Sequence, residues 1–108
     1  SRIAVCLDTA HSFASGYDIS DPKKLIREFD KIIGLKYLKA IHLNDSKTEF
    51  NSNVDRHENI GQGKIGLENI KKFINLSQLK NIPFILEVPG FNNQGPDKKN
   101  IKIVKGLL

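Results

Sequence analysis

The sequence holds a single cysteine, Cys6, and no methionine or tryptophan among its 108 residues. One cysteine forms no intramolecular disulfide and no cysteine-ligated zinc finger. Long apolar runs are also missing. The run at residues 3–7 is far shorter than the roughly 20 residues of a membrane helix and shorter than the apolar core of a secretory signal. We therefore expect a soluble chain with neither a membrane span nor a secretory leader.

The bulk composition is that of one small folded domain. Hydrophobic residues make up 39% and charged residues 27% of the chain, which is typical of globular proteins. The net charge of +5 is compatible with a polyanionic partner. Because most lysines fall in segments with a helical pattern, the charge also fits a solvated surface. Cys6 lies inside an apolar run, so we expect a buried, unreactive thiol.

Apolar periodicity predicts three strands that alternate with three helices. Short apolar runs predict strands at residues 3–7, 37–43 and 83–88, the first of them buried on both faces. Apolar residues three and four positions apart predict helices at about residues 22–33, 67–74 and 98–108. Ser20-Asp21-Pro22 and Pro96-Asp97 are typical helix starts, and Gly34 is a typical helix end.

The resulting β-α-β-α-β-α order implies an α/β fold with parallel strands joined by right-handed helical crossovers. Three such units leave both edges of the sheet unpaired. They make up less than half of an eight-stranded (β/α) barrel, which needs about 250 residues. We expect the chain to be the C-terminal portion of a larger protein. A complete, small three-stranded α/β domain is the alternative.

Each predicted strand ends with a residue that can bind metal or move protons: Asp8, His42 and Glu87. In parallel α/β folds the carboxyl ends of the strands meet at one edge, where sites are built. A single histidine at a strand end is more often a hydrogen-bonded core residue. A carboxylate in an apolar strand is costly unless paired or coordinated, so Glu87 favours a functional role. Three such residues at three strand ends indicate a site.

Two pairs of carboxylate and imidazole strengthen this interpretation. Asp8 and His11 share one βα turn, and Asp55 and His57 share the next βα loop. Side chains two residues apart point to the same side of an extended chain, so Asp55 and His57 could grip one cation. The same charged run would also fit a solvated loop. Imidazole with carboxylate and no thiolate suits zinc, manganese or iron(II).

Four segments carry a resemblance to a known family: VCLDTAHSFASGYDI, IHLNDSK, VDRHENIGQGKIG and PFILEVPG, in this order. Together they closely resemble the C-terminal part of endonuclease IV (deoxyribonuclease IV), the zinc-dependent AP endonuclease family. The resemblance implies that residues 1–108 are the last three βα units of a xylose isomerase-like TIM barrel. It also implies base-excision repair by the full-length protein, through hydrolysis of the phosphodiester 5′ to abasic sites and trimming of 3′ ends.

The resemblance implies that His11, Asp55 and His57 together bind one zinc ion, with His11 reaching across from the preceding turn. Arg56 then points the other way, toward a DNA phosphate. Lys47 is the second basic residue expected on the DNA face. The helix lysines are expected to contribute less.

By the same resemblance, Asp8, His42 and Glu87 are three of the four ligands of a second zinc ion, and they act in catalysis through it. A bridging glutamate and the ligands of a third zinc lie upstream in the family and have no counterpart in this sequence. We therefore expect little incision of abasic DNA by this chain alone.

Asp45 or Glu58 is expected to orient the histidines from behind. Three nearby glycines are expected to let the backbone return tightly from the site into the next helix. They are Gly61, Gly63 and Gly66.

The implied partner is duplex DNA with abasic sites, with no membrane and no obligate protein partner. The implied location is the cytoplasm, at the nucleoid, in a bacterium, or the nucleus, mitochondrion or plastid in a eukaryote. A metal-dependent sugar isomerase or epimerase of similar barrel fold is one alternative, and a noncatalytic module that retains one zinc is another. Asp55, Arg56 and His57 argue against the sugar enzyme, which has little use for another cation and a phosphate-facing arginine.

Overall fold

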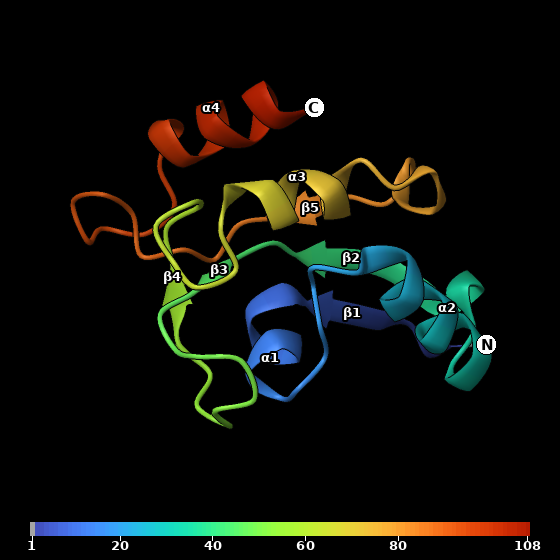
Figure 1. Ribbon diagram of the computed structural model, residues 1–108. Coiled ribbons are helices and arrows are strands. Elements are labelled where there is room, and N and C mark those ends of the chain that lie inside the picture. The colour runs from blue at the N-terminus through green and yellow to red at the C-terminus, as the bar shows by residue number, and fades with distance from the viewer. Residues whose placement is uncertain (1) are drawn as a thin grey trace.

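Three short strands form a parallel sheet in the order β1-β2-β5 in the computed structural model, which describes residues 2–108 (Figure 1). They are β1 (Val5–Asp8), β2 (Leu38–His42) and β5 (Phe84–Ile85). Both pairings are parallel, and the register places Asp8 opposite His42. The predicted α/β fold with a parallel sheet is confirmed.

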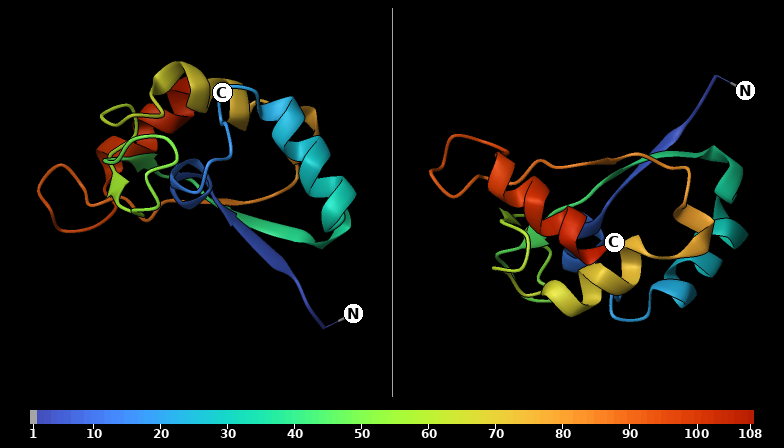
Figure 2. Two further views of the ribbon diagram at one scale, coloured as in Figure 1. Left: turned by 60° about the horizontal axis from the view of Figure 1, so that its bottom comes forward. Right: turned by 90° about the horizontal axis from the view of Figure 1, so that it is seen from above.

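The predicted helices are present close to their predicted bounds. Helix α2 (Pro22–Ile32) precedes β2, α3 (Leu67–Ile74) precedes β5, and α4 (Lys98–Leu107) follows it. Figure 2 shows all three gathered on one side of the sheet. Apolar side chains from this side of the sheet and from α2 and α3 fill the core. Among them are Leu25, Ile26, Phe29, Leu38, Ile41, Ile70, Phe73 and Ile74.

Capping explains where the helices begin. Asp21 directly precedes Pro22, and its side chain accepts a hydrogen bond from the main-chain N–H of Lys24. Both features are expected for a helix start. Asp97 caps α4, and the N–H groups of Asn100 and Phe91 that donate to it hold the pKa of its carboxyl below the usual value. The contribution of Asp97 to stability is therefore present above about pH 4 and is lost as the pH falls through the lowered pKa.

Two features were not predicted from the sequence. Helix α1 (Thr9–Ala14) begins directly after β1, and its six residues are too few to show a helical period. The segment expected to be a polar loop contains β3 (Asp45–Ser46) and β4 (His57–Glu58), which pair in antiparallel fashion. Two 3-10 helices, η1 (Leu35–Tyr37) and η2 (Ser77–Leu79), complete the element order.

The first strand is less buried than predicted, and this expectation was wrong. Ile3, just before β1, is 75% exposed, and Cys6 is also exposed. Val5 and Leu7 face α2, so Cys6 between them points to the opposite face of the sheet, away from the helices (Figure 2). The Cys6 thiol still has a raised pKa, caused first by partial desolvation and then by the negative charges of Asp8 and Glu87. The thiol is thus neutral at pH 7 and a poor nucleophile. The last strand is also shorter than predicted.

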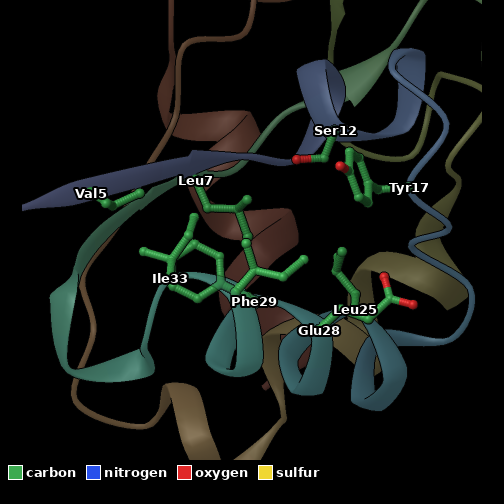
Figure 3. Close-up of a pocket in the computed structure, with 9 residues that line it drawn as sticks. Val5, Leu7, Ser12, Tyr17, Leu25, Glu28, Phe29 and Ile33 are labelled. Atoms are coloured by element: carbon green, nitrogen blue, oxygen red, sulfur yellow. The ribbon is translucent and has the colours of Figure 1, made fainter.

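An open apolar groove runs between β1 and α2 (Figure 3). Leu7 lines it from the strand, and Leu25, Phe29 and Ile33 line it from α2 and the residue after it. It lies apart from the acidic and imidazole groups at the strand ends, so it is not a candidate for their chemistry.

Across residues 2–108, every helix is too short or too polar to cross a membrane.

Glycine is required at position 63 because residues 45 and 46 lie too close to leave room for a side chain. A Cβ added there would clash with the Ser46 carbonyl oxygen and lie 2.6 Å from Oδ1 of Asp45. Both neighbouring groups belong to β3, which the turn at Gly63 crosses closely. No heavy atom lies within 4 Å of a Cβ added at Gly106, in the last turn of α4.

We expect Gly63→Ala to lower the free energy of unfolding by about 1–3 kcal/mol, the usual cost of overpacking. Gly106→Ala is the matched control and should leave stability unchanged or raise it by about 0.5–1 kcal/mol, because alanine is the better helix former. Urea denaturation followed by circular dichroism measures both. Wild-type stability of Gly63→Ala would contradict this account of the turn.

Candidate metal centre

The three strand-end residues meet at the carboxyl edge of the sheet. Asp8 ends β1, His42 ends β2, and Glu87 lies two residues beyond β5. Nδ1 of His42 lies 2.6 Å from Oε1 of Glu87 and 3.8 Å from Oδ2 of Asp8. One ligand atom from each residue lies within 4.8 Å of the others. The structure therefore places these three residues in one cluster that could hold a metal ion.

A second cluster shares Asp8 with the first. Nε2 of His57 lies 3.3 Å from Oδ2 of Asp8 and 3.6 Å from Oδ1 of Asp55. These three residues also offer ligand atoms that lie within 4.8 Å of one another. Oδ2 of Asp8 thus faces both His42 and His57, and the two clusters meet at this oxygen.

His11 lies at the rim of the second cluster. Its Nδ1 is 3.2 Å from Oδ2 of Asp55, and its side chain is 66% exposed. The sequence grouped His11 with Asp55 and His57. Among the described residues, the ion-pair contact of the His11 imidazole is with Asp55, and the compact trio around His57 consists of Asp8, Asp55 and His57. The main-chain N–H of His11 donates to Oδ1 of Asp8 at 2.9 Å, so the helix start holds His11 next to the cluster.

The hydrogen bond at Nδ1 of His57 determines which ring nitrogen is left with a free lone pair. Its Nδ1 lies 3.1 Å from the main-chain carbonyl oxygen of Glu87. A carbonyl oxygen only accepts, so Nδ1 carries the hydrogen. In the neutral ring, Nε2 then presents its lone pair toward Asp8 and Asp55. This arrangement is typical of histidines that bind metal.

The donor set fits a divalent cation. The carboxylates of Asp8, Asp55 and Glu87 converge, and within residues 2–108 their ion-pair partners are histidines, without lysine or arginine. Ligand atoms at a tetrahedral zinc with bonds of about 2.0–2.1 Å are separated by roughly 3.3 Å. Four of the five distances between imidazole nitrogens and carboxylate oxygens are 3.2–3.8 Å. Nitrogen and oxygen ligands without sulfur suit zinc, manganese or iron(II).

Asp45 does not orient a histidine, and this expectation was wrong. Its carboxylate is fully buried and accepts hydrogen bonds from the main-chain N–H groups of Gly61, Gly63 and Ile65 at 2.9–3.1 Å. The tight turn leaves these donors without strand or helix partners, and a buried donor needs one. Asp45 therefore fixes the glycine turn beside the site. The Glu58 carboxylate accepts a hydrogen bond from the main-chain N–H of Asn59 at 2.8 Å.

Asn44 was not anticipated from the sequence. Its side chain is fully buried and donates to Oδ2 of Asp8 at 3.2 Å. It also accepts from the main-chain N–H of Glu87 at 2.8 Å. The available signal was its position, two residues after His42 at the end of an apolar strand.

The two basic residues expected to face DNA lie beside the clusters. Lys47 and Arg56 are exposed, and the Lys47 N–H donates to the Arg56 carbonyl oxygen at 3.0 Å. This bond extends the pairing of β3 with β4 by one residue on each strand. Arg56 also lies between Asp55 and His57 in the chain, so its main chain is part of the same rim.

A parallel sheet with carboxylates and imidazoles at its carboxyl edge is the arrangement in which α/β barrels build their sites. The family model described as xylose isomerase-like TIM barrel matches residues 1–106. The chain belongs to this family, and within it to the endonuclease IV branch, as the relatives below show.

Relatives named as endonucleases match nearly all of the chain. It is 50% identical over 107 residues to probable endonuclease 4 of Methanosphaera stadtmanae, covering 98% of this chain and 38% of that protein. It is 50% identical over 95 residues to apurinic-apyrimidinic endonuclease 1 of Plasmodium falciparum, covering 85% of this chain and 16% of that protein. The crystal structure of endonuclease IV from Thermus thermophilus superposes with a TM-score of 0.85 at 39% identity, covering 96% of this chain and 38% of that one.

We expect at least one zinc ion per chain after dialysis against trace zinc, measured by atomic emission. His57→Ala should remove the ion expected at Asp55 and His57, because Nε2 of His57 lies 3.3 Å from Asp8 and 3.6 Å from Asp55. Glu49→Ala is the control, since this carboxylate is 75% exposed and pairs with Lys64. Equal zinc content in both variants would exclude His57 as a ligand.

Proposed function

We propose that this chain forms part of a zinc-dependent DNA-repair endonuclease that hydrolyses the phosphodiester 5′ to abasic sites in duplex DNA and trims 3′ ends. One observation carries the proposal. Three carboxylates and the imidazoles between them converge at the carboxyl edge of a parallel sheet, in a chain similar to proteins named endonuclease 4. These names support a nuclease over a sugar isomerase with a similar barrel.

Two groups of residues would hold the metal. Asp8, His42 and Glu87 would be ligands of one zinc ion. His11, Asp55 and His57 would be ligands of another, with His11 on its exposed side. When bound, zinc supplies a Lewis acid that activates water for attack on phosphorus and stabilises charge on the departing 3′ oxygen. That chemistry requires no side chain of this chain to act as a general base.

The remaining work of these residues is orientation. The Glu87 carbonyl oxygen holds the His57 ring with Nε2 toward the site, and His42 and Glu87 are in direct contact. Arg56 and Lys47 would bind DNA phosphates on the exposed side of the same rim, because both are cationic and solvated. An abasic nucleotide is turned out of the duplex at low cost, because it has lost its base pairing.

The chain spans 38% of the length of the endonuclease 4 relatives from Methanosphaera and Thermosipho. The activity proposed here therefore belongs to the complete protein that contains this segment. The family resemblance implies a bridging glutamate and two histidine ligands upstream of it. Tests of catalysis accordingly use the complete protein.

In the complete protein, Glu87→Gln should lower the rate of incision of an abasic duplex more than about 100-fold, since even residues behind the ligands typically cost 10–100-fold. The fold should persist, because the Glu87 side chain is 46% exposed. Glu49→Gln serves as the control for loss of an exposed carboxylate. An unchanged rate for Glu87→Gln would remove Glu87 from the site.

Arg56→Ala should weaken binding of abasic duplex and reduce the slope of log affinity against log salt concentration by about one, as expected for loss of one phosphate contact. Arg27→Ala, on the exposed face of α2, is the control and should leave the slope unchanged. Fluorescence anisotropy at several salt concentrations measures both. The same slope in the two variants would place Arg56 away from DNA.

A further inference from the structure

Asn44 joins all three strand ends of the sheet. Its side chain is fully buried. The Nδ2 group donates to Oδ2 of Asp8, at the end of β1, and Oδ1 accepts from the N–H of Glu87, after β5. Asn44 itself lies two residues past the end of β2. A single amide therefore ties together the two carboxylate residues of the first metal cluster.

The main chain of Asn44 is held as firmly as its side chain. Its N–H donates to Oγ1 of Thr9 at 2.9 Å, and the Thr9 hydroxyl donates back to the Asn44 carbonyl oxygen at 2.7 Å. Thr9 is itself buried and directly follows Asp8. Two hydrogen bonds through Thr9 therefore hold the main chain next to Asp8 against the main chain of Asn44.

The oxygen that Asn44 binds is the one that both metal clusters share. Oδ2 of Asp8 faces His57 at 3.3 Å and His42 at 3.8 Å. Oδ1 of the same carboxylate is engaged by the His11 N–H at the start of α1. Each oxygen of Asp8 therefore has one fixed donor, so its plane and direction are set before any ion binds.

We propose that Asn44 is the positioning residue of the metal centre: its amide aims Oδ2 of Asp8 at both clusters and fixes the main chain of Glu87. The proposal rests on the metal-dependent function proposed above. Asparagine suits this role because one end of its amide only donates and the other only accepts. Loss of such a contact behind a ligand typically weakens metal affinity 10–100-fold.

Asn100 provides a closely matched control. It is fully buried, its Oδ1 accepts from the Ile60 N–H at 2.9 Å, and its Nδ2 donates to Oδ1 of Asp97 at 2.9 Å. Asn44 makes the same two kinds of bond. Asp97 caps a helix and belongs to neither metal cluster. Asn44→Ala and Asn100→Ala therefore remove similar buried hydrogen bonds, and only the first touches a proposed ligand.

The first measurement is zinc affinity, by competition with a chromophoric chelator. Asn44→Ala should bind zinc 10–100-fold more weakly than wild type, and Asn100→Ala should stay within about twofold. Equal losses in the two variants would show that Asn44 acts only through general stability and would overturn the proposal.

The second measurement needs no metal. In the zinc-free protein, NMR couplings about χ1 of Asp8 should report one rotamer in wild type and Asn100→Asp, and an averaged rotamer in Asn44→Asp. The Asn44→Asp substitution keeps an acceptor for the Glu87 N–H and replaces the donor to Asp8 with a second carboxylate. Asn100→Asp puts the same charge beside Asp97, so it is the matched control. Asn44→Asp also serves if Asn44→Ala fails to fold. An unchanged coupling in Asn44→Asp would overturn the proposal. An Asp8 rotamer that is fixed in wild type and averaged in Asn44→Asp, in a protein with no zinc affinity, would instead refute the proposed metal function while supporting the role of Asn44 in orienting Asp8.

Discussion

Parallel pairing of β1 with β2 puts Asp8 directly opposite His42, and the candidate metal centre depends on this register. A shift by one residue would turn every side chain of one strand to the opposite face of the sheet. With the register fixed, Asp8 reaches toward two histidines from different elements. The sheet is small, but the alignment of its strand ends defines the centre.

Two buried polar side chains connect the aligned strand ends to the neighbouring loops by hydrogen bonds. Asn44 and Asp45 are neighbours and both are fully buried. The first bonds to residues at the ends of β1 and β5, and the second to the turn that follows β4. Across the described residues, every buried side-chain nitrogen or oxygen has a hydrogen-bond partner. Such satisfied networks favour one arrangement over its competitors, because any slip leaves a buried donor or acceptor unpaired.

The sequence was informative where a signal is local. Apolar runs predicted β2, periodicity predicted α2, α3 and α4, and capping residues marked the starts of α2 and α4. These elements are specified by residues within a few positions of one another. The meeting of Asp8, His42 and Glu87 followed from the rule for parallel strand ends. Partners far apart in the chain were not predictable in this way: Asn44 contacts residues 36 and 43 positions distant. The exposure of Cys6 depends on what covers the face of the sheet opposite α2, which no local pattern reports.

The segment from Gly61 to Gly66 looks supple in the sequence because glycine restricts the backbone least. Inside the fold, the single carboxylate of Asp45 gathers the amide protons of that segment from several directions at once. Glycine allows the tight turn of this segment, and the buried Asp45 carboxylate accepts the hydrogen bonds that hold the turn in place. Asp45 also lies in β3, which pairs with the strand that carries His57. One carboxylate therefore connects the glycine segment to the strand pair beside the candidate metal centre.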